Sequence, residues 1–321
     1  MADVVVAIPS HRRPARLRAL LDMLQRQTLA PERFEIVVCH TPDEETGELL
    51  RGHPVAAAGR LRAICLAPGE RGPALQRNRA WQAVEAPRVA FIDDDCRPVP
   101  EWLEELLSVA AQNPGAIVEG ATRPDPEEAH MLERAFARSL EVDPPSTFAA
   151  TCNILYPRPV LERMAGFDES FPSAGEDTDL MLRAVASGAP HVGAAEAVVW
   201  HAVDPGSLLG RLRSLPRWQH LALVVRRHPG IRARLPLGVF WKDSHVRLVP
   251  LLAGLALAGA TRRPRWLVLA LPWLLLRRRW YGWGPRALAA GTRDTTGLLI
   301  VDTTELAVMA RGSIRYRTLL L

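Results

Sequence analysis

The sequence predicts an α/β domain, with a mostly parallel sheet flanked by helices, followed by a helical C-terminal region. Two observations lead to this interpretation. Short β-branched runs alternate with amphipathic helical patterns through about the first 200 residues. From about Pro205 the pattern changes to Arg-rich amphipathic helix and then to apolar runs. We therefore expect one domain over residues 1–205 and a second region over residues 206–321.

The distribution of charge separates the same two regions. Residues 1–202 carry 20 Lys/Arg and 30 Asp/Glu, a net charge of −10, whereas residues 203–321 carry 20 and 5, a net charge of +15. Such an asymmetry indicates that the two regions have different partners. Basic segments attract anions, either nucleic acid or anionic lipid, and the apolar character of this one favours lipid.

Each element of the first region has a local signal. A β-branched run over Val4–Ile8 stops at Pro9, which is typical of a buried parallel strand. Pro14 suits the first turn of a following helix, in which the leucines between residues 17 and 24 recur at helical spacing. The same signals predict strands over residues 34–38, 89–92, 117–120 and 198–201 and helices over residues 74–84 and 102–111.

The ends of the predicted strands indicate where a ligand binds. Ser10, Cys39 and Asp93 each come at or directly after the end of a predicted strand. In open parallel sheets the ligand lies at the carboxyl ends of the strands. A site at this edge is therefore expected before any family is considered.

Three consecutive carboxylates, Asp93, Asp94 and Asp95, follow the apolar strand over residues 89–92. Charges this close repel one another and are costly to bury without a counter-charge. A hard divalent cation such as Mg²⁺ or Mn²⁺ would neutralise them and would bridge to phosphate oxygens. A solvated acidic turn is the other interpretation, and the motif alone leaves both open.

Two further motifs are equally ambiguous when each is taken alone. Glu176 and Asp177 open a predicted helix, where acidic residues serve as ordinary caps, or where one carboxylate removes a proton from an acceptor hydroxyl. His201 ends a predicted strand as a packed or surface residue, or as a ligand that completes a metal site with Asp95.

In their order and spacing these motifs resemble the family-2 glycosyltransferases of the GT-A fold, over about residues 4–202. The pattern of Gly-Phe-Asp-Glu followed by Glu-Asp is its most diagnostic part. The resemblance implies an inverting, metal-dependent transfer of a sugar from a nucleotide-sugar donor. It rests on residues 7–14 (A-I-P-S-H-R-R-P), 76–80 (Q-R-N-R-A), 93–95 (D-D-D), 152–153 (C-N), 166–169 (G-F-D-E), 176–177 (E-D) and 200–201 (W-H).

The resemblance also implies roles for individual residues. Asp177 would be the catalytic base, with Glu176 beside it near the acceptor. Asp95 would coordinate the divalent cation that holds the donor diphosphate, with Asp93 and His201 as further ligands. The donor-binding set would comprise Pro9, Ser10 and Arg12 along the nucleoside, Arg77 at the base, Asn78 in the adjacent loop, Asp93 at the ribose and Asp94.

One segment departs from the family's pattern. Family members usually end the second strand with an Asp that recognises the nucleobase, whereas this chain has Cys39 and His40 there. Asp43 comes too late in the sequence to replace it. Contact with the base would then fall to Arg77 or to backbone groups, and the identity of the nucleotide stays open.

The C-terminal region is expected to associate with a membrane surface. Apolar runs over residues 248–260 and 266–276 flank three arginines, and each run is shorter than the roughly 20 residues that span a bilayer. A spanning hairpin would also place those arginines on the far side, against the positive-inside tendency. We therefore expect interfacial helices or a shallow re-entrant pair; the alternative is packing on the first domain or a dimer interface. Aromatic residues suited to the headgroup level are Trp241, Trp266, Trp273, Trp280, Tyr281 and Trp283.

These observations predict an enzyme of cell-envelope or polysaccharide synthesis that is cytoplasmic and peripheral on the inner face of the membrane. Its partners would be a nucleotide-sugar donor, a saccharide or lipid-linked acceptor and anionic lipid. A polyprenyl-phosphate sugar transferase and a catalytically inactive, membrane-bound sugar-binding or scaffold protein are the alternatives. Nucleic acid is not an expected partner, because the basic tail lacks a recognised motif. A strand-like start predicts no signal peptide, and four cysteines without a C-x-x-C pair fit a reducing compartment.

Overall fold

A computed structural model describes residues 2–281 and 285–321, with side chains described for all of these except residues 278–290 and 292–293. The chain divides into two compact units. Unit 1 comprises residues 1–133 and 138–204, and unit 2 comprises residues 134–137 and 205–321. The predicted boundary at residue 205 lies next to this division, and the assignment of two separate domains stays a prediction.

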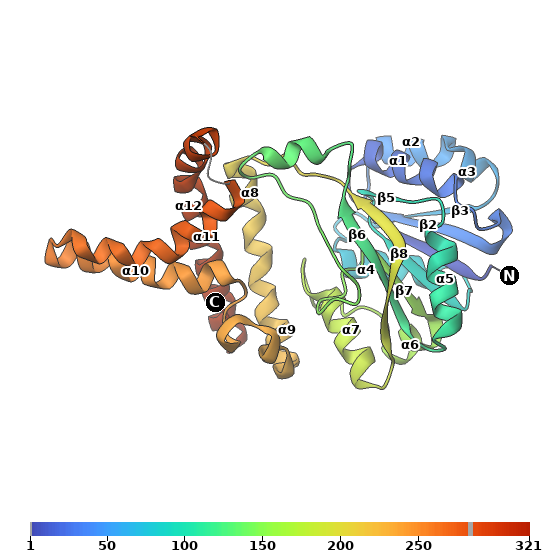
Figure 1. Cartoon of the computed structure of the whole chain (residues 1–321). Helices are drawn as coiled ribbons and strands as arrows, with labels where there is room; N and C mark the ends of the chain where they lie inside the picture. Colours follow the sequence, from blue (N-terminus) through green and yellow to red (C-terminus); the bar gives the residue numbers. More distant parts are fainter. Residues whose placement is uncertain (1, 282–284) are drawn as a thin grey trace. The chain divides into compact units, whose positions relative to one another are not determined.

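Unit 1 is built on one eight-stranded sheet with the order β3-β2-β1-β4-β7-β6-β8-β5 (Figure 1). The strands, in chain order, are β1 (Val4–Ser10), β2 (Phe34–His40), β3 (Leu61–Cys65), β4 (Arg88–Ile92), β5 (Cys96–Pro98), β6 (Ile117–Pro124), β7 (Asn153–Pro157) and β8 (His191–His201). All the predicted strands are present, and most extend by one or more residues beyond the predicted ends.

The sheet is mixed, which corrects the prediction of a mostly parallel one. Strands β3, β2, β1 and β4 are parallel neighbours, and β6 is parallel to β8. Strand β7 is antiparallel to both β4 and β6, and β5 is antiparallel to β8. Between β6 and β7 the described chain forms only the short 3-10 helix Ala129–Glu133, so it lacks the helical crossover that usually joins neighbouring parallel strands.

Helices cover both faces of this sheet. Alternate residues of β1 point into two separate cores, Val4, Val6 and Ile8 into one and Val5 and Ala7 into the other. This burial on both faces explains why β1 has a continuous apolar run instead of an alternating pattern. The first core includes α1 (Pro14–Gln25), α2 (Glu44–Gly52), α3 (Pro54–Ala57) and α5 (Trp102–Gln112), and the second includes α4 (Pro73–Gln82), α6 (Arg158–Arg163) and α7 (Glu176–Ala186).

Unit 2 is helical. One of its buried apolar clusters is formed by Leu248, Leu251 and Trp273, and other buried apolar residues lie on α8 to α9 and α12, among them Leu215, Leu221, Val224, Val301 and Met309. The second predicted apolar run is divided between the 3-10 helix η6 (Pro264–Ala270) and α11. Trp283 lies outside the described residues, as do the side chains of Trp280 and Tyr281. The α-helices are α8 (Leu208–Ser214), α9 (Leu221–Arg227), α10 (Asp243–Thr261), α11 (Leu271–Tyr281) and α12 (Pro285–Tyr316).

Candidate active site

The register of the sheet brings the end of β1 beside the acidic triplet. Ala7 lies opposite Phe91 in the parallel pair of β1 and β4, and continuing that register by three residues places Ser10 opposite Asp94. The Ser10 hydroxyl donates a hydrogen bond of 2.8 Å to the Asp94 carboxylate, and the His11 amide donates a second at 3.2 Å. Asp94 therefore holds the loop that follows β1.

Asp94 points inward, unlike the two carboxylates beside it. Its residue is 4% exposed, and Arg13 supplies the nearest cation, with Nη1 3.2 Å from Oδ1. Burial raises the pKa of Asp94 to about 6, although Arg13 acts in the opposite direction. Arg13 also contacts Asp95 at 2.5 Å, so a single exposed guanidinium partly neutralises two members of the triplet.

Asp95 and His201 come together, as the resemblance implies. Cys96 pairs with His201 across the antiparallel strands β5 and β8, and this register sets His201 Nε2 3.8 Å from Asp95 Oδ1. The ligand atoms of Asp95, Cys96 and His201 all lie within 4.8 Å of one another. Two different parts of the sheet thus bring a carboxylate, an imidazole and a thiol to one point.

The second nitrogen of His201 is already engaged. Nδ1 lies 2.8 Å from the carbonyl oxygen of Ala202 and 3.2 Å from the hydroxyl of Ser139. A proton on Nδ1 would be donated to the Ala202 carbonyl, which leaves the Nε2 lone pair facing Asp95. Ligating histidines are commonly oriented by such a bond from the other ring nitrogen. The carboxylate and imidazole donors suit a divalent cation such as Mn²⁺, so these residues fit the predicted metal.

Arg77 joins the two acidic motifs. It is buried on α4, and its Nη2 lies 2.8 Å from Asp93 whereas its Nη1 lies 2.8 Å from Glu176. The planar guanidinium is suited to two simultaneous carboxylate contacts. The geometry assigns Arg77 to this bridge, and its contact with a nucleobase stays a prediction.

Glu176 and Asp177 occupy the first turn of α7, where the helix dipole favours negative charge. Glu176 is 4% exposed, and its Oε2 has no hydrogen-bond partner among the described residues. Asp177 is half-buried and accepts a hydrogen bond of 2.8 Å from the Thr178 amide. Burial, followed by the neighbouring Glu176 charge, raises the pKa of Asp177 above its ordinary value. A carboxylate in this environment is a better proton acceptor near neutral pH than an exposed one.

Asn78 holds the Gly-Phe-Asp-Glu segment in place. Its side-chain amide donates to the Phe167 carbonyl and to the Glu169 carboxylate, and its oxygen accepts from the Phe167 amide. Gly166 packs so closely on Asn78 that a Cβ there would lie 2.5 Å from Oδ1, and its φ of +69° is one that L residues rarely adopt. The Gly-Phe-Asp-Glu segment is thus tied to α4, the helix that carries Arg77.

The remaining predicted residues lie nearby in sequence but differ in their contacts. Pro9 is buried in β1, whereas Arg12 is exposed in the following loop with a φ of +53°. The sequence interpretation missed Arg13, although two carboxylates contact it, and Cys96. Arg13 belongs to the opening motif, and Cys96 directly follows the acidic triplet. Their positions next to predicted site residues could therefore have indicated them.

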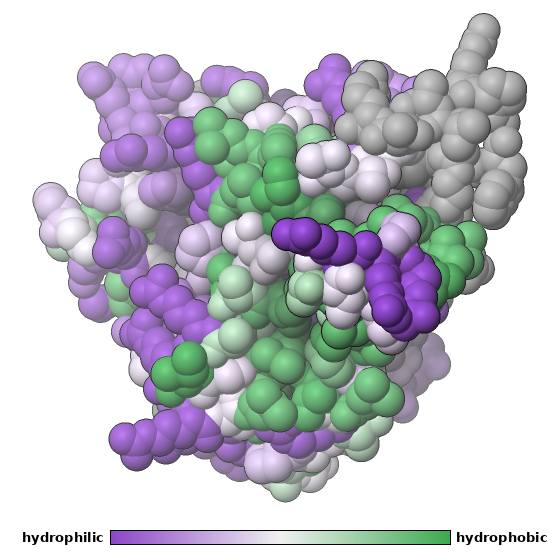
Figure 2. Space-filling view, turned by 90° about the vertical axis from the view of Figure 1, so that its left-hand side faces the viewer, coloured by the Kyte–Doolittle hydropathy of each residue, from purple (hydrophilic) through white to green (hydrophobic). Residues whose placement is uncertain are grey.

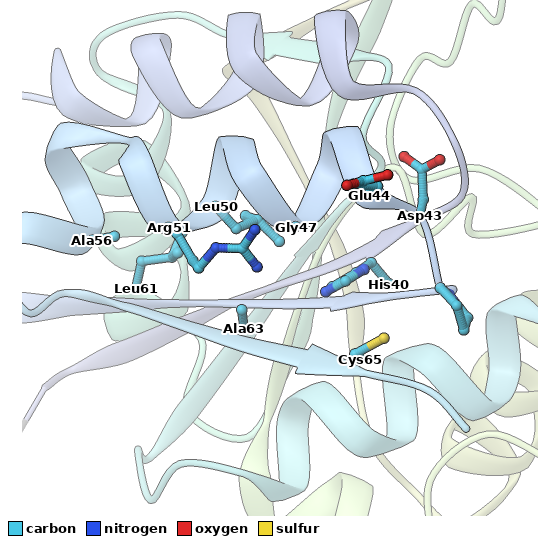
Figure 3. A pocket seen from close by; sticks show the side chains of 11 residues that line it. His40, Asp43, Glu44, Gly47, Leu50, Arg51, Ala56, Leu61, Ala63 and Cys65 are labelled. Atoms are coloured by element: carbon cyan, nitrogen blue, oxygen red, sulfur yellow. The ribbon is translucent and has the colours of Figure 1, made fainter. Parts of the chain in front are cut away.

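A separate cavity of about 470 Å³ lies between α2 and the edge strand β3. Arg51 extends along it toward His40, and Asp43 and Glu44 lie at the same end as His40 (Figure 3). None of the predicted site residues lines this cavity. It adjoins the end of β2, which is the segment where the chain departs from the family's pattern.

The likeness to known proteins follows the same part of the chain. A family described as Glycosyltransferase like family 2 matches residues 2–220. Validoxylamine A glucosyltransferase of Streptomyces hygroscopicus subsp. limoneus is 28% identical over 273 residues, which cover 74% of this chain and 58% of that protein. The chain thus spans about three fifths of the length of the curated relatives that it matches over most of its own length.

A more local likeness and a structural one accompany this match. Glucosyl-dolichyl phosphate glucuronosyltransferase of Haloferax volcanii is 29% identical over 120 residues, which cover 33% of this chain and 37% of that protein. The mannosyltransferase PcManGT from Pyrobaculum calidifontis, solved in complex with GDP-Man and Mn²⁺, superposes with a TM-score of 0.57 and 19% identity, covering 98% of this chain and 87% of that one. With a family match over residues 2–220 and a GT-A-like fold, the chain belongs to glycosyltransferase family 2.

Proposed function

We propose that this chain is a metal-dependent, inverting glycosyltransferase that moves a sugar from a nucleotide-sugar donor to a hydroxyl of a saccharide or lipid-linked acceptor. The observation that carries the proposal is the Arg77 bridge, which brings the acidic triplet and the Glu176–Asp177 pair to one place. The donor side and the acceptor side of such a reaction need carboxylates with different tasks. Family membership and the fit of Asp95 and His201 to a divalent cation support the same reaction.

The mechanism is a single displacement. Asp177 accepts the proton of the acceptor hydroxyl while that oxygen forms its bond to the anomeric carbon. The bond from that carbon to the donor phosphate oxygen breaks on the opposite side, so the configuration inverts. Asp95 and His201 would hold the cation, which when bound neutralises charge on the diphosphate. Arg77 holds Glu176 in place beside Asp177 through its ion pair.

For the acceptor and the cellular role we propose only a general class. We place the enzyme in cell-envelope or polysaccharide synthesis, on the cytoplasmic face of the membrane. Support comes from the basic charge of residues 203–321 and from a relative whose name includes a dolichyl phosphate-linked sugar. Helix α10, with 19 residues and a mean hydropathy of 1.3, is long and apolar enough to cross a membrane, and among the described residues it alone passes that test.

A donor-binding experiment tests the proposal. Thermal unfolding is measured with UDP-, GDP-, dTDP- and CDP-linked sugars, each with Mn²⁺ and with EDTA. We expect one nucleotide series to raise the melting temperature only with Mn²⁺, because a ligand that binds the folded state stabilises it. Asp95→Ala should remove that metal-dependent shift. Asp125→Asn is a matched control, because this buried carboxylate pairs with Arg97 instead.

The outcomes separate the alternatives. A folded protein that responds to no donor would support the inactive sugar-binding or scaffold protein and would overturn the proposal. An equal shift in EDTA would overturn the metal dependence alone. Once a donor is identified, transfer to a polyprenyl phosphate and not to saccharide hydroxyls would favour the polyprenyl-phosphate transferase.

A further inference from the structure

Within unit 2, helix α10 has a buried half and an exposed half. Its first turns are fixed by Ser244, His245, Leu248 and Leu251, all buried. Beyond Gly254 almost every residue is exposed, although the sequence remains apolar to residue 260. A helix that keeps its leucines in water through its last turns has a face that the described residues of the unit leave uncovered.

The returning chain adds to this exposed surface. Gly254 lets η6 approach α10 closely, since a Cβ there would lie 2.6 Å from the Trp266 carbonyl oxygen. In Figure 2, apolar residues form a broad area crossed and bordered by hydrophilic side chains. We call the surface made by residues 249–275 the apolar hairpin. Its exposed large side chains are Val249, Leu255, Leu257, Leu267, Val268, Leu271, Leu274 and Leu275.

Three arginines occupy the turn of the apolar hairpin. Arg262 directly follows α10 and has a φ of +53°. Arg263 comes before η6 and Arg265 lies within it. All three are exposed, and the Arg265 guanidinium lies over the Trp266 ring at 5.1 Å. The described residues show no carboxylate paired with any of these three side chains. Cations beside apolar side chains and an indole form a combination typical of helices at a lipid headgroup surface.

We propose that the apolar hairpin docks in the interface of an anionic phospholipid bilayer, with its leucines among the acyl chains and its three arginines at the lipid phosphates. The inference deepens the membrane association proposed above and rests on it. The length of the exposed part of α10 indicates insertion at the interface and not across the bilayer. The exposed part of α10, residues 255–261, is about 10 Å long at 1.5 Å per residue, against a hydrocarbon core of about 30 Å.

The cost of burying the three arginines and the charge of the C-terminal region both favour docking at an anionic lipid interface. Pushing the turn to the centre of the bilayer would bury three arginines, each at a cost of about 2.5–3.5 kcal/mol on insertion scales. Pairing with a second copy of the chain would instead bring together two regions that each carry a net charge of +15, which repel one another. An anionic lipid surface satisfies both the apolar face and the cations.

Flotation of the full chain with vesicles tests the proposal. We expect strong binding to vesicles of mixed phosphatidylcholine and phosphatidylglycerol and weak binding to phosphatidylcholine alone. Changing Arg262, Arg263 and Arg265 to Gln should weaken binding to the anionic vesicles roughly 100-fold, since each basic residue near such a surface contributes roughly 5-fold. The control removes the same charge from exposed arginines of unit 1, as Arg18→Gln, Arg26→Gln and Arg163→Gln.

A second variant tests the apolar contribution. Val268→Gln, Leu271→Gln and Leu275→Gln, at residues 48–57% exposed, should weaken binding at least about 10-fold. The control variant Leu209→Gln, Ile314→Gln and Leu319→Gln, at residues 52–82% exposed elsewhere in the unit, should not. Both variants remain interpretable if circular dichroism and donor-induced stabilisation match the wild type.

Each result decides a separate point. If the wild-type chain ignores every vesicle, membrane association fails together with this inference. If it floats but both hairpin variants float equally well, the inference alone is wrong. If the lipid-free chain is a dimer in sedimentation and the apolar variant is a monomer that still floats, the hairpin is a contact between copies. None of these outcomes depends on sugar transfer.

Discussion

The two units of the molecule bury opposite charge arrangements. In unit 1 one cation, Arg77, lies between the carboxylates of Asp93 and Glu176. In unit 2 one carboxylate, Glu305, lies between Arg211 and Lys242, each at 2.7 Å, with His245 Nε2 at 3.4 Å. Both central residues are nearly inaccessible to solvent, so removing either one would leave buried charges without a partner.

The clusters differ in how completely their hydrogen bonds are satisfied. Both oxygens of Glu305 are engaged, and its partners come from α8, from the start of α10 and from the residue before it. In this cluster Nδ1 of His245 is buried without a partner among the described residues. In unit 1, Nε of Arg77 and Oε2 of Glu176 are buried without partners among the described residues. Buried polar groups are usually satisfied, and exceptions call for an explanation such as a ligand or water. The carboxylate of the unit 1 cluster thus keeps an unused acceptor, whereas that of the unit 2 cluster does not, and we expect only the unit 1 cluster to take part in ligand binding.

The largest expected effect concerns Asp177, the proposed catalytic base. Asp177→Asn keeps the shape of the side chain and its position in α7 but cannot accept a proton. We expect kcat to fall by roughly 10²–10⁴-fold, the usual contribution of general-base catalysis, while donor-induced stabilisation is retained. Steady-state transfer kinetics and thermal shift measure the two quantities.

A neighbouring carboxylate provides the control for this variant. Asp179→Asn removes the same charge from the same helix, but Asp179 pairs with Arg183. It should lower stability and leave kcat of the folded enzyme nearly unchanged. Near-normal transfer by Asp177→Asn would exclude Asp177 as the base and would direct attention to Glu176.

The next prediction concerns the central residues of the two clusters, Arg77 and Glu305. Arg77→Met leaves Glu176 buried without a cation, and breaking such a pair costs about 3–5 kcal/mol of unfolding free energy. It should also reduce donor-induced stabilisation, because Asp93 loses its anchor. Arg77→Lys keeps the charge but lacks the planar guanidinium that contacts both carboxylates at once. We therefore expect its loss of unfolding free energy to be smaller than that of Arg77→Met. Urea unfolding followed by circular dichroism measures the change.

Glu305→Met is the counterpart in unit 2. It should destabilise the protein while leaving metal-dependent donor stabilisation intact, since its partners belong to unit 2. If the two variants affect donor binding equally, the distinction between a structural cluster and a ligand-binding one is wrong.

The sequence predicted five of the eight strands and missed β3, β5 and β7. The hydrophobic runs specify that residues 4–8 and 89–92 are buried strands, and the structure confirms both. Strand β7 was not predicted, and it is this strand, antiparallel between β4 and β6, that makes the sheet mixed. Strand direction depends on the path of the connecting chain, and residues 125–152 have no readable helical pattern. The sheet was therefore predicted as more parallel than it is.

The candidate site shows the same limit at the level of side chains. Motif order predicted that His201 approaches Asp95, and the structure sets them 3.8 Å apart, although their binding of a metal stays a prediction. The Arg77 bridge joins residues 99 positions apart in the sequence. It depends on how α4 and α7 pack on one face of the sheet. A motif gives residue types and order, whereas a charge pairing of this kind needs the tertiary arrangement.

The smallest expected effect is the pH dependence of the unit 2 cluster. Although burial acts the other way, the bonds from His245 and Lys242 and the charge of Arg211 lower the pKa of Glu305 from an ordinary value of 4.5 to about 2. The folded state therefore binds this proton less readily than the unfolded chain. The resulting stability is complete above pH 4.5 and is lost as the pH falls toward 2. By pH 3 the wild type should lose about 2 kcal/mol from this group.

Glu305→Gln removes this titration while keeping the size of the side chain. The free energy of unfolding should be measured with urea between pH 6 and pH 3. Over this range the wild type should lose about 2 kcal/mol more than the variant. The variant should be the less stable protein at pH 6. Glu162→Gln, an exposed carboxylate of unit 1, is the control and should follow the wild type. Parallel acid limbs for wild type and Glu305→Gln would mean that Arg211, Lys242 and the hydrogen bond from His245 do not lower the pKa of Glu305, and that the cluster in unit 2 is more open than its distances indicate.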